Sequence, residues 1–378
     1  MGFEQNDFEI VASYDHWEAA IKCYNRNFDH AAMREDLNDV PRMVELITAH
    51  EPQVIIGGPP CQEFSNAGRR QEGEKAELTI AYAKIVTALR PNYFVMENVP
   101  RIKESKAYSV ARELYTEAGY GLTEVILDAS KCGVPQKRSR FFCVGGLDQE
   151  NEFLLGKIFS QYIGEPISVQ KYFNNINYDA NIEYYYRHPT TYDRRAVFSL
   201  DTISPTIRGV NRPRSSTYKP HKSDASTFEN VRQLSTRERA LIQTFPMDFS
   251  FDDLELPKCD IEQMIGNAVP VGLSSLVARC LIQYEEGDIM QKETSFAKWL
   301  KENKKYTDRT ISDVFSRINR AKTILPSEKV DIYYIADLNV IPEYLQMASD
   351  IRSQIQRALK LLIEFENSLP EATQAPIK

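Results

Sequence analysis

The sequence lacks most features of secreted and membrane-anchored proteins. Its six cysteines are scattered, and none forms a C-x-x-C pair or accompanies a His-rich segment. This spacing argues against a disulfide framework and against a zinc site, so we expect no metal ion and a reducing, cytoplasmic environment. No apolar run approaches the ~20 residues that cross a bilayer. The first residues, MGFEQNDFEI, lack the basic and apolar regions of a signal peptide.

An excess of positive charge is also absent, since the formal net charge is −7. An acidic protein still binds nucleic acid when the surface that faces the phosphates is locally basic, so the charge leaves the class of partner open. The chain has 378 residues, of which 42% are hydrophobic and 26% charged. These values are typical of a soluble globular protein with two or three domains.

Short apolar runs alternate with helical stretches as far as about Gly146. The alternation favours an α/β fold with a parallel, doubly wound sheet. Strands are predicted at Phe8–Ser13, Val54–Ile56, Tyr93–Met96, Leu122–Leu127 and Phe141–Val144. Helices are predicted at Trp17–Asn27, Ala76–Leu89 and Tyr108–Glu117.

The alternation ends after Gly146. Residues 147–230 are rich in Tyr, Asn, Arg, Ser and Pro and are predicted to be a loop-rich insert with short strands. Helices are predicted at Thr236–Phe245, where Ser235 and Glu238 fit a capping box, and at Val271–Tyr284, Ile311–Ile324 and Pro342–Phe365. We therefore predict a catalytic lobe at 1–146 and 231–286, an insert at 147–230, and a helical C-terminal extension at 287–378.

Three segments carry candidate chemistry. In the first, GGPPCQ, paired glycines turn the chain off the strand Val54–Ile56 and two prolines stiffen the loop that holds Cys61. In the second, Glu97 directly follows the strand Tyr93–Met96 and so is expected at the same sheet edge. In the third, GVPQKRSR, alternation along an extended segment predicts that Arg138 and Arg140 share one face.

Each segment also has an ordinary structural interpretation. An isolated cysteine is usually a small buried side chain, an isolated loop glutamate is usually a solvated acid, and two arginines are usually a surface pair. Together, a thiol, a carboxylic acid and paired guanidinium groups are the functional groups that nucleophilic attack on a pyrimidine ring requires.

The chain resembles the C5 cytosine DNA methyltransferase family over residues 1–285. The segments GGPPCQEFS, MENVP, GVPQKRSR, RQLSTRERALIQTFP and QMIGNAVP occur in that family's order and roughly its spacing. The resemblance implies a large catalytic lobe, a small target-recognition lobe, and S-adenosylmethionine (SAM) as cofactor. It implies that Cys61 attacks C6 of a flipped cytosine, that Glu97 protonates N3, that Arg140 holds the O2 side of the ring, and that Arg138 fixes the catalytic loop and the base.

The same resemblance assigns further residues to ligand contacts. For SAM, it implies Asp15 on the ribose, His16, Asp36 and Leu37 at the adenine, and Gly58, Pro60, Leu78, Asn267 and Val269 around the pocket. Taken alone, Asp15 equally suits the N-cap of the following helix. For double-stranded DNA, Ser65 and Arg69 are candidate phosphate contacts. Within TIRGVNRPR, the candidates for base reading are Arg208, Asn211 and Arg212, which also suit contacts to the DNA backbone.

One part of the family's pattern is absent. MGFEQNDFEIV resembles the segment that follows the first strand, and the family's Asp-Leu-Phe-x-Gly-x-Gly-Gly strand and loop does not occur in the chain. Three interpretations stand. The start codon is misassigned, a separate upstream peptide or subunit completes the fold, or the chain is a degenerate relative.

The leading hypothesis is a DNA (cytosine-5-)-methyltransferase of a restriction–modification system. An RNA cytosine-5 methyltransferase is a second hypothesis, although an insert of more than eighty residues favours a DNA reader. A third hypothesis, prompted by the absent strand, is a truncated or split, non-catalytic DNA-binding subunit.

Overall fold

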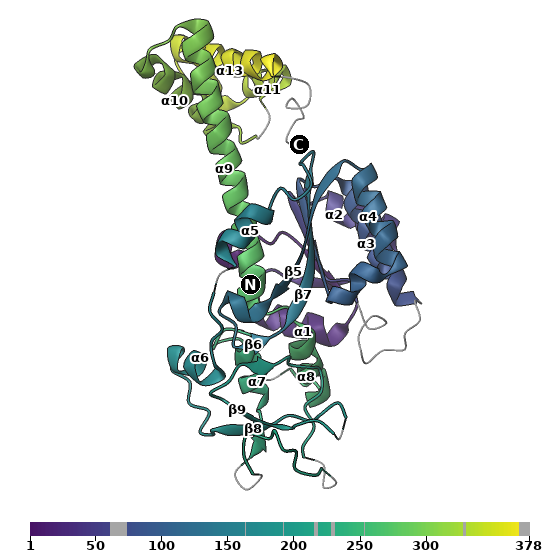
Figure 1. The fold of residues 1–378 in the computed structure, drawn as a ribbon. Helices are drawn as coiled ribbons and strands as arrows, with labels where there is room; N and C mark the ends of the chain where they lie inside the picture. Colours follow the sequence, from purple (N-terminus) through teal and green to yellow (C-terminus); the bar gives the residue numbers. More distant parts are fainter. Residues whose placement is uncertain are drawn as a thin grey trace. The chain divides into compact units, whose positions relative to one another are not determined.

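The computed structural model describes residues 1–60, 74–162, 164–191, 193–214, 218–227, 231–252, 254–327 and 330–369. The chain forms two compact units, Met1–Ile282 and Gln283–Lys378 (Figure 1). The boundary lies close to the end of the predicted catalytic lobe at residue 286.

The main sheet of the first unit has four strands in the order β3-β4-β7-β5. Their bounds are Val54–Gly57 for β3, Tyr93–Asn98 for β4, Tyr120–Asp128 for β5 and Ser139–Leu147 for β7. The four strands predicted between Val54 and Val144 are therefore all present. The sheet is mixed, because β3 and β4 are parallel whereas β7 runs antiparallel to both of its neighbours. The prediction of a wholly parallel sheet is wrong at this edge.

A separate pair of parallel strands precedes this sheet: β1 (Ser13–Asp15) and β2 (Ala32–Arg34). The predicted strand at Phe8–Ser13 is wrong by several residues, because only its last residue enters β1. In the described part of the chain, β1 pairs with β2 alone and β3 pairs with β4 alone. β3 is an apolar strand, yet Ile56 is 45% exposed, whereas Tyr93–Met96 of β4 are buried. The outer edge of β3 is therefore an apolar edge that no described strand covers.

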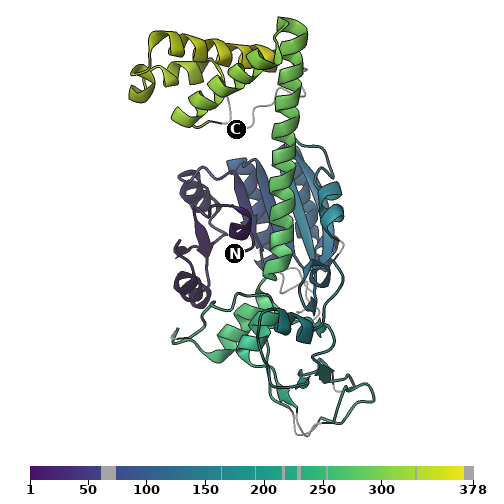
Figure 2. The same ribbon diagram turned by 90° about the vertical axis from the view of Figure 1, so that its left-hand side faces the viewer.

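Helices cover the main sheet (Figure 1). On one face lie α2 (Val40–Thr48), α3 (Glu74–Leu89) and α4 (Lys106–Glu117), and α1 (Glu18–Asn27) connects β1 to β2. The core beneath them includes Phe94, Tyr115 and Phe141. The first turns of α9 (Val271–Lys304) lie on the opposite face, as the two ribbon views agree (Figure 2).

The beginning of the predicted insert is attached to the main sheet. The Glu152 amide donates to the Leu122 carbonyl, and the Leu154 amide donates to the Thr123 hydroxyl. After α5 (Leu155–Gln161), the Tyr162 hydroxyl accepts a hydrogen bond from the Asp128 amide at 2.6 Å. The part of the chain that stands apart from the sheet therefore begins later than residue 147.

The remainder of the insert forms a small lobe of short elements. A three-stranded sheet has the order β11-β8-β9, and β10 pairs with β6 of the catalytic motif. Their bounds are Gln136–Lys137 (β6), Tyr184–Tyr186 (β8), Val197–Ser199 (β9), Ser204–Pro205 (β10) and Arg232–Gln233 (β11), with α6 at Val169–Asn175. The core of this lobe continues under α7 (Thr236–Ile242), so the insert and the returning chain share one apolar cluster.

Two sequence features of the returning segment are confirmed. α7 begins with the predicted capping box, in which the Ser235 and Glu238 side chains each accept a backbone N–H of the other residue. Residues 258–287 are long and apolar enough to cross a membrane by composition, which the sequence analysis did not register. They are divided between α8 (Lys258–Asn267) and α9, and 56% of the most apolar window is buried, as in the core helices of a globular protein.

The second unit is helical, as expected. It contains the end of α9 with α10 (Asp308–Ile324), α11 (Ile332–Leu338), α12 (Pro342–Leu345) and α13 (Ser349–Ser368). Its own apolar core includes Phe296, Ile318, Tyr344 and Leu359. The single helix predicted at Pro342–Phe365 is wrong, because the chain breaks after Leu345 and restarts at Ser349.

Candidate active site

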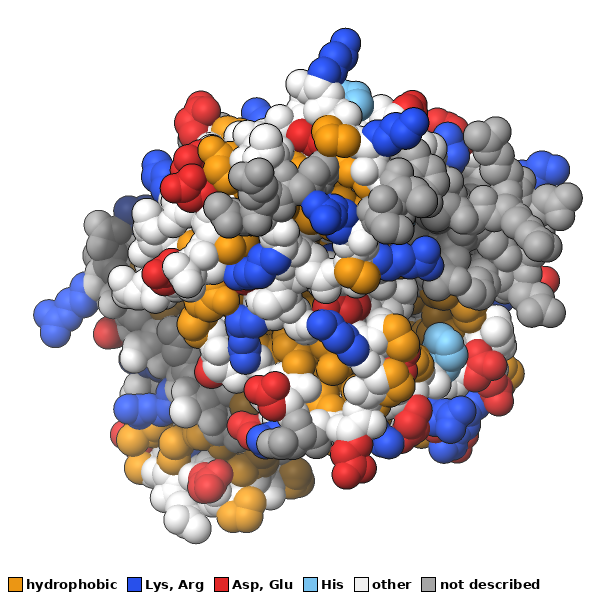
Figure 3. Space-filling view, turned by 90° about the horizontal axis from the view of Figure 1, so that it is seen from below, with side chains coloured by type: hydrophobic (Ala, Val, Ile, Leu, Met, Phe, Trp, Pro, Cys, Tyr) orange, Lys and Arg blue, Asp and Glu red, His pale blue; other side chains and the backbone are white. Residues whose placement is uncertain are grey.

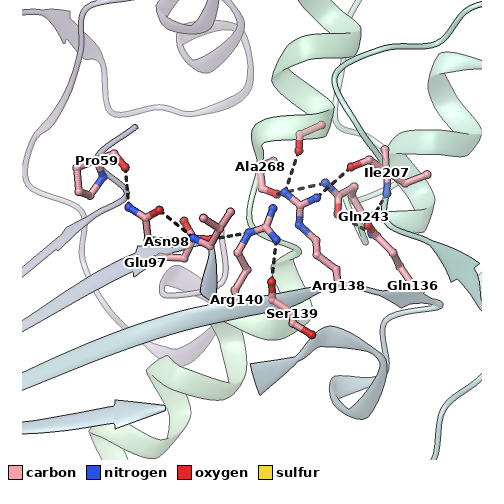
Figure 4. Close-up of polar contacts among 12 residues, drawn as sticks. Pro59, Glu97, Asn98, Gln136, Arg138, Ser139, Arg140, Ile207, Gln243 and Ala268 are labelled. Atoms are coloured by element: carbon pink, nitrogen blue, oxygen red, sulfur yellow. Dashed lines mark hydrogen bonds and ion pairs between the residues drawn. The ribbon is translucent and has the colours of Figure 1, made fainter. Parts of the chain in front are cut away.

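Glu97 and Arg140 form an ion pair at the edge of the main sheet. Glu97 lies near the end of β4, Arg140 lies at the start of the antiparallel strand β7, and Arg140 Nε is 2.9 Å from Glu97 Oε1 (Figure 4). Both side chains are about 15% exposed. Arg140 Nη1 also donates to the Ser139 carbonyl at 2.8 Å, which leaves the guanidinium held against the carboxylate.

The loop after β3 lies directly beside this pair. Asn98 donates from its side-chain amide to the Pro59 carbonyl at 3.0 Å. A Cβ added to Gly58 would lie 3.2 Å from Glu97 Oε2, so a side chain there would crowd the carboxylate. Cys61 follows Gly58 by three residues. Cys61, Ser65 and Arg69 lie outside the described residues, and their assignments remain predictions.

Burial changes the acidity of Glu97. Loss of water around the carboxylate raises its pKa above the usual value, and this effect outweighs the opposing charges of Arg140 and Arg138. A raised pKa favours the protonated acid, which is the form that donates a proton. The geometry therefore presents a carboxyl group with a raised pKa and a guanidinium, side by side, at the sheet edge.

Arg138 is buried more deeply than Arg140, and Figure 4 shows the two side chains on the same side of the chain, as predicted. Arg138 lies between β6 and β7, and its carbonyl accepts the Ala129 amide at 3.0 Å, so the extended backbone of β7 continues through it. It is 1% exposed and donates to the carbonyl oxygens of Ile207, Gly266 and Ala268 at 2.8 to 3.0 Å (Figure 4). These bonds suit the predicted role of Arg138 in fixing the loop, which remains a prediction.

We predict that Arg138→Met destabilises the protein. Three carbonyl groups lose a charged donor, and each orphaned buried group costs ~1–3 kcal/mol, so the free energy of unfolding should fall by about 3 kcal/mol or more. Urea denaturation measures the change. Arg101→Met, at an exposed position of the neighbouring turn, is the control and should shift stability by less than about 0.5 kcal/mol. Equal stability of the two variants would refute this role.

Four of the other cysteines are unsuited to nucleophilic attack. Burial raises the pKa of Cys132 and Cys143 to about 12 and that of Cys23 and Cys280 to about 11. All four are therefore protonated near neutral pH, and the thiolate is the reactive form. Cys259 is exposed on α8.

The predicted cofactor residues follow the carboxyl ends of parallel strands. Asp15 ends β1, and its carbonyl accepts the Glu35 amide at 3.0 Å, which places Asp15 next to the segment that carries Asp36 and Leu37. Asp15 and Asp36 are exposed, and each carboxylate accepts a backbone amide two residues on. His16 is also exposed and lies 3.5 Å from the Asp15 carboxylate.

The remaining cofactor candidates come from three other segments. Gly58 is exposed and Pro60 half-buried after β3, and Leu78 is half-buried on α3. Asn267 is exposed at the end of α8, where its side-chain oxygen accepts from Gln263 at 2.7 Å, and Val269 is half-buried. Exposed carboxylates beside half-buried apolar side chains suit a nucleoside with ribose hydroxyls and an apolar base face.

Two of the base-reading candidates are occupied by internal contacts. Arg208 is half-buried and donates to the His188 carbonyl, and Asn211 donates to the Leu234 carbonyl at 2.9 Å and to Glu262 at 3.1 Å. Arg212 is exposed. Their roles in DNA binding remain predictions.

Basic side chains gather on the lower face of the molecule. Figure 3 shows Lys and Arg side chains around the middle of this face. The exposed basic residues of the catalytic motif and the small lobe are Lys137, Arg194, Arg195, Arg212, Arg214, Lys219, Lys222 and Arg232. A locally basic surface on an acidic protein is what binding to a phosphate backbone requires.

Gln136, Arg187 and Gln243 are additional candidate residues of the site that were not predicted from the sequence. Gln136 accepts the Ile207 amide at 2.7 Å and donates to Gln243 at 2.7 Å. Gln136 could have been identified from its position inside GVPQKRSR. Arg187 has no such signal in the sequence, because it is distinguished from the other arginines of the insert only by lining the same cavity as Arg140.

The chain is similar to known methyltransferases. A sequence profile described as C-5 cytosine-specific DNA methylase matches residues 1–283. The type II methyltransferase M.HindV of Haemophilus influenzae is 46% identical over 292 residues, which cover 76% of this chain and 94% of that protein. The type II methyltransferase M.HgiDI of Herpetosiphon aurantiacus is 46% identical over 293 residues, 77% of this chain and 93% of that protein.

Solved structures share the fold at low sequence identity. The Dnmt2 methyltransferase of S. pombe has a TM-score of 0.55 and 19% identity, over 75% of this chain and 94% of that one. A putative DNA modification methyltransferase from an E. coli prophage has a TM-score of 0.52 and 19% identity, over 75% of this chain and 95% of that one. The sheet, the motif geometry and the matched sequences agree, and the chain belongs to the C-5 cytosine-specific DNA methylase family.

Proposed function

We propose that the chain methylates C5 of cytosine in double-stranded DNA through a covalent bond to Cys61. The observation that carries the proposal is the Glu97–Arg140 pair beside the loop that leads to Cys61. Two relatives at 46% identity are named type II methyltransferases, which supports a role in restriction–modification and favours DNA over RNA as substrate. It also follows that the protein acts in the cytoplasm.

The residues divide the chemistry between them. The Cys61 thiolate forms a bond to C6, and the electrons of the C5–C6 double bond move toward N3, which Glu97 protonates. Arg140 holds the O2 side of the ring, while Arg138 fixes the loop that carries Arg140. SAM, when bound, supplies the electrophilic methyl group that C5 accepts. Loss of the C5 proton to solvent, return of the N3 proton to Glu97 and breaking of the C6–sulfur bond then restore the aromatic ring and the thiolate. A stacked base is out of reach of these groups, so the cytosine must be flipped out.

We predict that Glu97→Gln slows methyl transfer about 10²- to 10⁴-fold, because glutamine forms hydrogen bonds but cannot transfer a proton to N3. The measurement is tritium transfer from labelled SAM to DNA, with bisulfite sequencing to locate 5-methylcytosine. Glu124→Gln is the matched control. Glu124 lies on β5 of the same sheet, and its carboxylate is also paired with an arginine, 3.1 Å from Arg112 Nε.

Two results would count against the proposal. Absence of 5-methylcytosine with the wild-type chain would contradict the activity itself. Equal rates for Glu97→Gln and Glu124→Gln would contradict the role of Glu97 while leaving the activity in place.

SAM is proposed to contact Asp15, His16, Asp36, Leu37, Gly58, Pro60, Leu78, Asn267 and Val269. We further propose that a separate peptide or subunit supplies a strand with the family's Gly-rich loop, which lies between β1 and β3 and completes this pocket. In support, β1 and β3 each have one partner among the described strands, and the apolar strand β3 is partly exposed. A strand with unpaired edges accepts a new neighbour through its free backbone groups.

Residues 147–230 are proposed to select the DNA sequence, with Arg208, Asn211 and Arg212 as candidate base contacts. Outside this region, Ser65 and Arg69 are proposed to contact DNA phosphates. Replacing this region by the matching region of a relative with a different target should change which site is methylated, because Glu97, Arg138 and Arg140 lie outside it. Bisulfite sequencing of plasmid DNA reads the site. An unchanged site in an active, folded chimera would refute the assignment.

A further inference from the structure

A cavity of about 430 Å³ lies between the catalytic motif and the small lobe. Its catalytic wall includes Lys137, Ser139 and Arg140, and its opposite wall includes Arg187, Pro205 and Thr206. Three of these side chains are cationic, and none of the described residues that line the cavity is acidic. A concave site of this size accommodates a small ligand, and its charge selects an anion.

Arg187 is fixed in this wall by bonds that use only part of its donor capacity. It follows β8, and its amide donates to the Ala196 carbonyl at 2.8 Å. Its Nη2 donates to the Thr206 carbonyl at 2.9 Å, and the Thr206 hydroxyl donates to the Lys137 carbonyl at 2.7 Å. A guanidinium carries five N–H donors, so a single carbonyl leaves most of them directed elsewhere.

The charge of Arg187 is not neutralised within the described part of the protein. No carboxylate among the described residues lies within ion-pair distance of it, in contrast to Arg140 beside Glu97 or Arg239 beside Glu262. Burial, together with the positive charge of Arg208, lowers the pKa of Arg187 to about 10. A partly buried cation without a counter-ion is costly, and the cost is recovered when an anion binds.

We propose that Arg187 binds a phosphodiester group of the flipped nucleotide, with Lys137 on the facing wall. The inference rests on the proposed function, because flipping is what brings a nucleotide to Arg140. Once the cytosine lies against Glu97 and Arg140, its flanking phosphates must enter or border the same cavity. The planar fork of a guanidinium matches two phosphate oxygens, and the Thr206 carbonyl holds that fork in place.

The test measures equilibrium binding of the full chain to a duplex that contains a site mapped by bisulfite sequencing. The target cytosine is mispaired to lower the cost of flipping. In two further duplexes, the phosphate on its 5′ or 3′ side is a neutral methylphosphonate. The proteins are wild type, Arg187→Gln and Arg187→Lys. Arg195→Gln is the matched control, because Arg195 is an exposed arginine of the same lobe that stacks on Phe198 and does not line the cavity.

We expect one methylphosphonate to weaken wild-type binding about tenfold or more, as loss of one charge-assisted contact implies. Arg187→Gln should bind the unmodified duplex and that methylphosphonate duplex with the same, reduced affinity. Arg187→Lys should retain part of the wild-type difference in affinity between these two duplexes. Arg195→Gln should keep the full wild-type difference in affinity between the unmodified duplex and that methylphosphonate duplex. Melting temperatures confirm that all variants are folded.

Other outcomes overturn the inference. If wild type ignores both methylphosphonates, or if Arg187→Gln remains as sensitive as wild type, then Arg187 does not contact the phosphate. If wild type does not bind the duplex at all, the proposed function fails and the phosphate contact fails with it. The first result leaves methylation intact, so the two failures are distinguishable.

Discussion

Cys61→Ser should abolish methyl transfer, with a loss on the order of 10⁴- to 10⁶-fold, the scale at which removal of a catalytic nucleophile is felt. The serine hydroxyl has a far higher pKa than a thiol, so almost no nucleophile exists near neutral pH. Affinity for DNA should change little, because the substitution keeps the size and the loop. Single-turnover methyl transfer and fluorescence anisotropy measure the two properties separately.

The matched control is Cys259→Ser, which changes the exposed cysteine of α8 and should leave the rate unaltered. DNA with 5-fluorocytosine at the target should trap the wild-type protein covalently, since fluorine cannot leave as the C5 proton does. Peptide mapping of the trapped complex identifies the sulfur. Attachment at Cys132 or Cys143 would refute the assignment of Cys61, and would be unexpected because burial raises the pKa of both thiols.

Residues 1–378 alone should bind SAM weakly by calorimetry, and affinity should rise at least tenfold when a peptide with the Gly-rich strand is supplied in cis or in trans. Among the described strands, β1 pairs only with β2 and β3 only with β4, and each backbone group that stays unpaired costs ~1–3 kcal/mol if buried. By the family resemblance, the Gly-rich loop after that strand would also supply the backbone amides that hold the carboxylate of SAM. Against a total stability of ~5–15 kcal/mol, several such groups are a large defect.

A peptide of the same composition with prolines at alternate positions is the control, since proline has no amide hydrogen to pair with β1 or β3. It should restore nothing. Tight SAM binding and full turnover by residues 1–378 alone would contradict the prediction, and would show that another segment occupies the position between the two strands.

The sequence was sufficient to predict most of the main sheet and the principal pair of the site. The apolar run Val54–Ile56 before GGPP and the apolar run Tyr93–Met96 before Glu97 were predicted as strands, and both are present as β3 and β4. Glu97 was expected at the same sheet edge as Cys61, which lies outside the described residues; Glu97 does lie beside Gly58, in the loop that leads to Cys61. The capping box of α7 was equally readable, because all of its bonds lie within four residues.

Features that depend on contacts between distant parts of the chain could not be predicted from the sequence. Arg138 is buried because its acceptors lie 69 to 130 residues further along the chain, and no local pattern encodes that distance. β1 is displaced from Phe8–Ser13 toward Asp15 because its register is set by pairing with β2. The break after Leu345 replaced one expected helix by two, in a segment whose apolar period alone suggested continuity.

The pairing of β10 with β6 has a consequence for how this enzyme can diversify. Ser204 and Pro205 pair with Gln136 and Lys137, and Ile207 is bonded to both Gln136 and Arg138. Residues 204–207 are therefore bonded to the catalytic motif although they lie within the insert. The parts of the insert on either side of them are not independent, because the Asp224 carboxylate accepts the Ala196 and Val197 amides and Arg208 donates to the His188 carbonyl. We therefore expect a new DNA specificity to require the exchange of both parts together, with residues 204–207 kept.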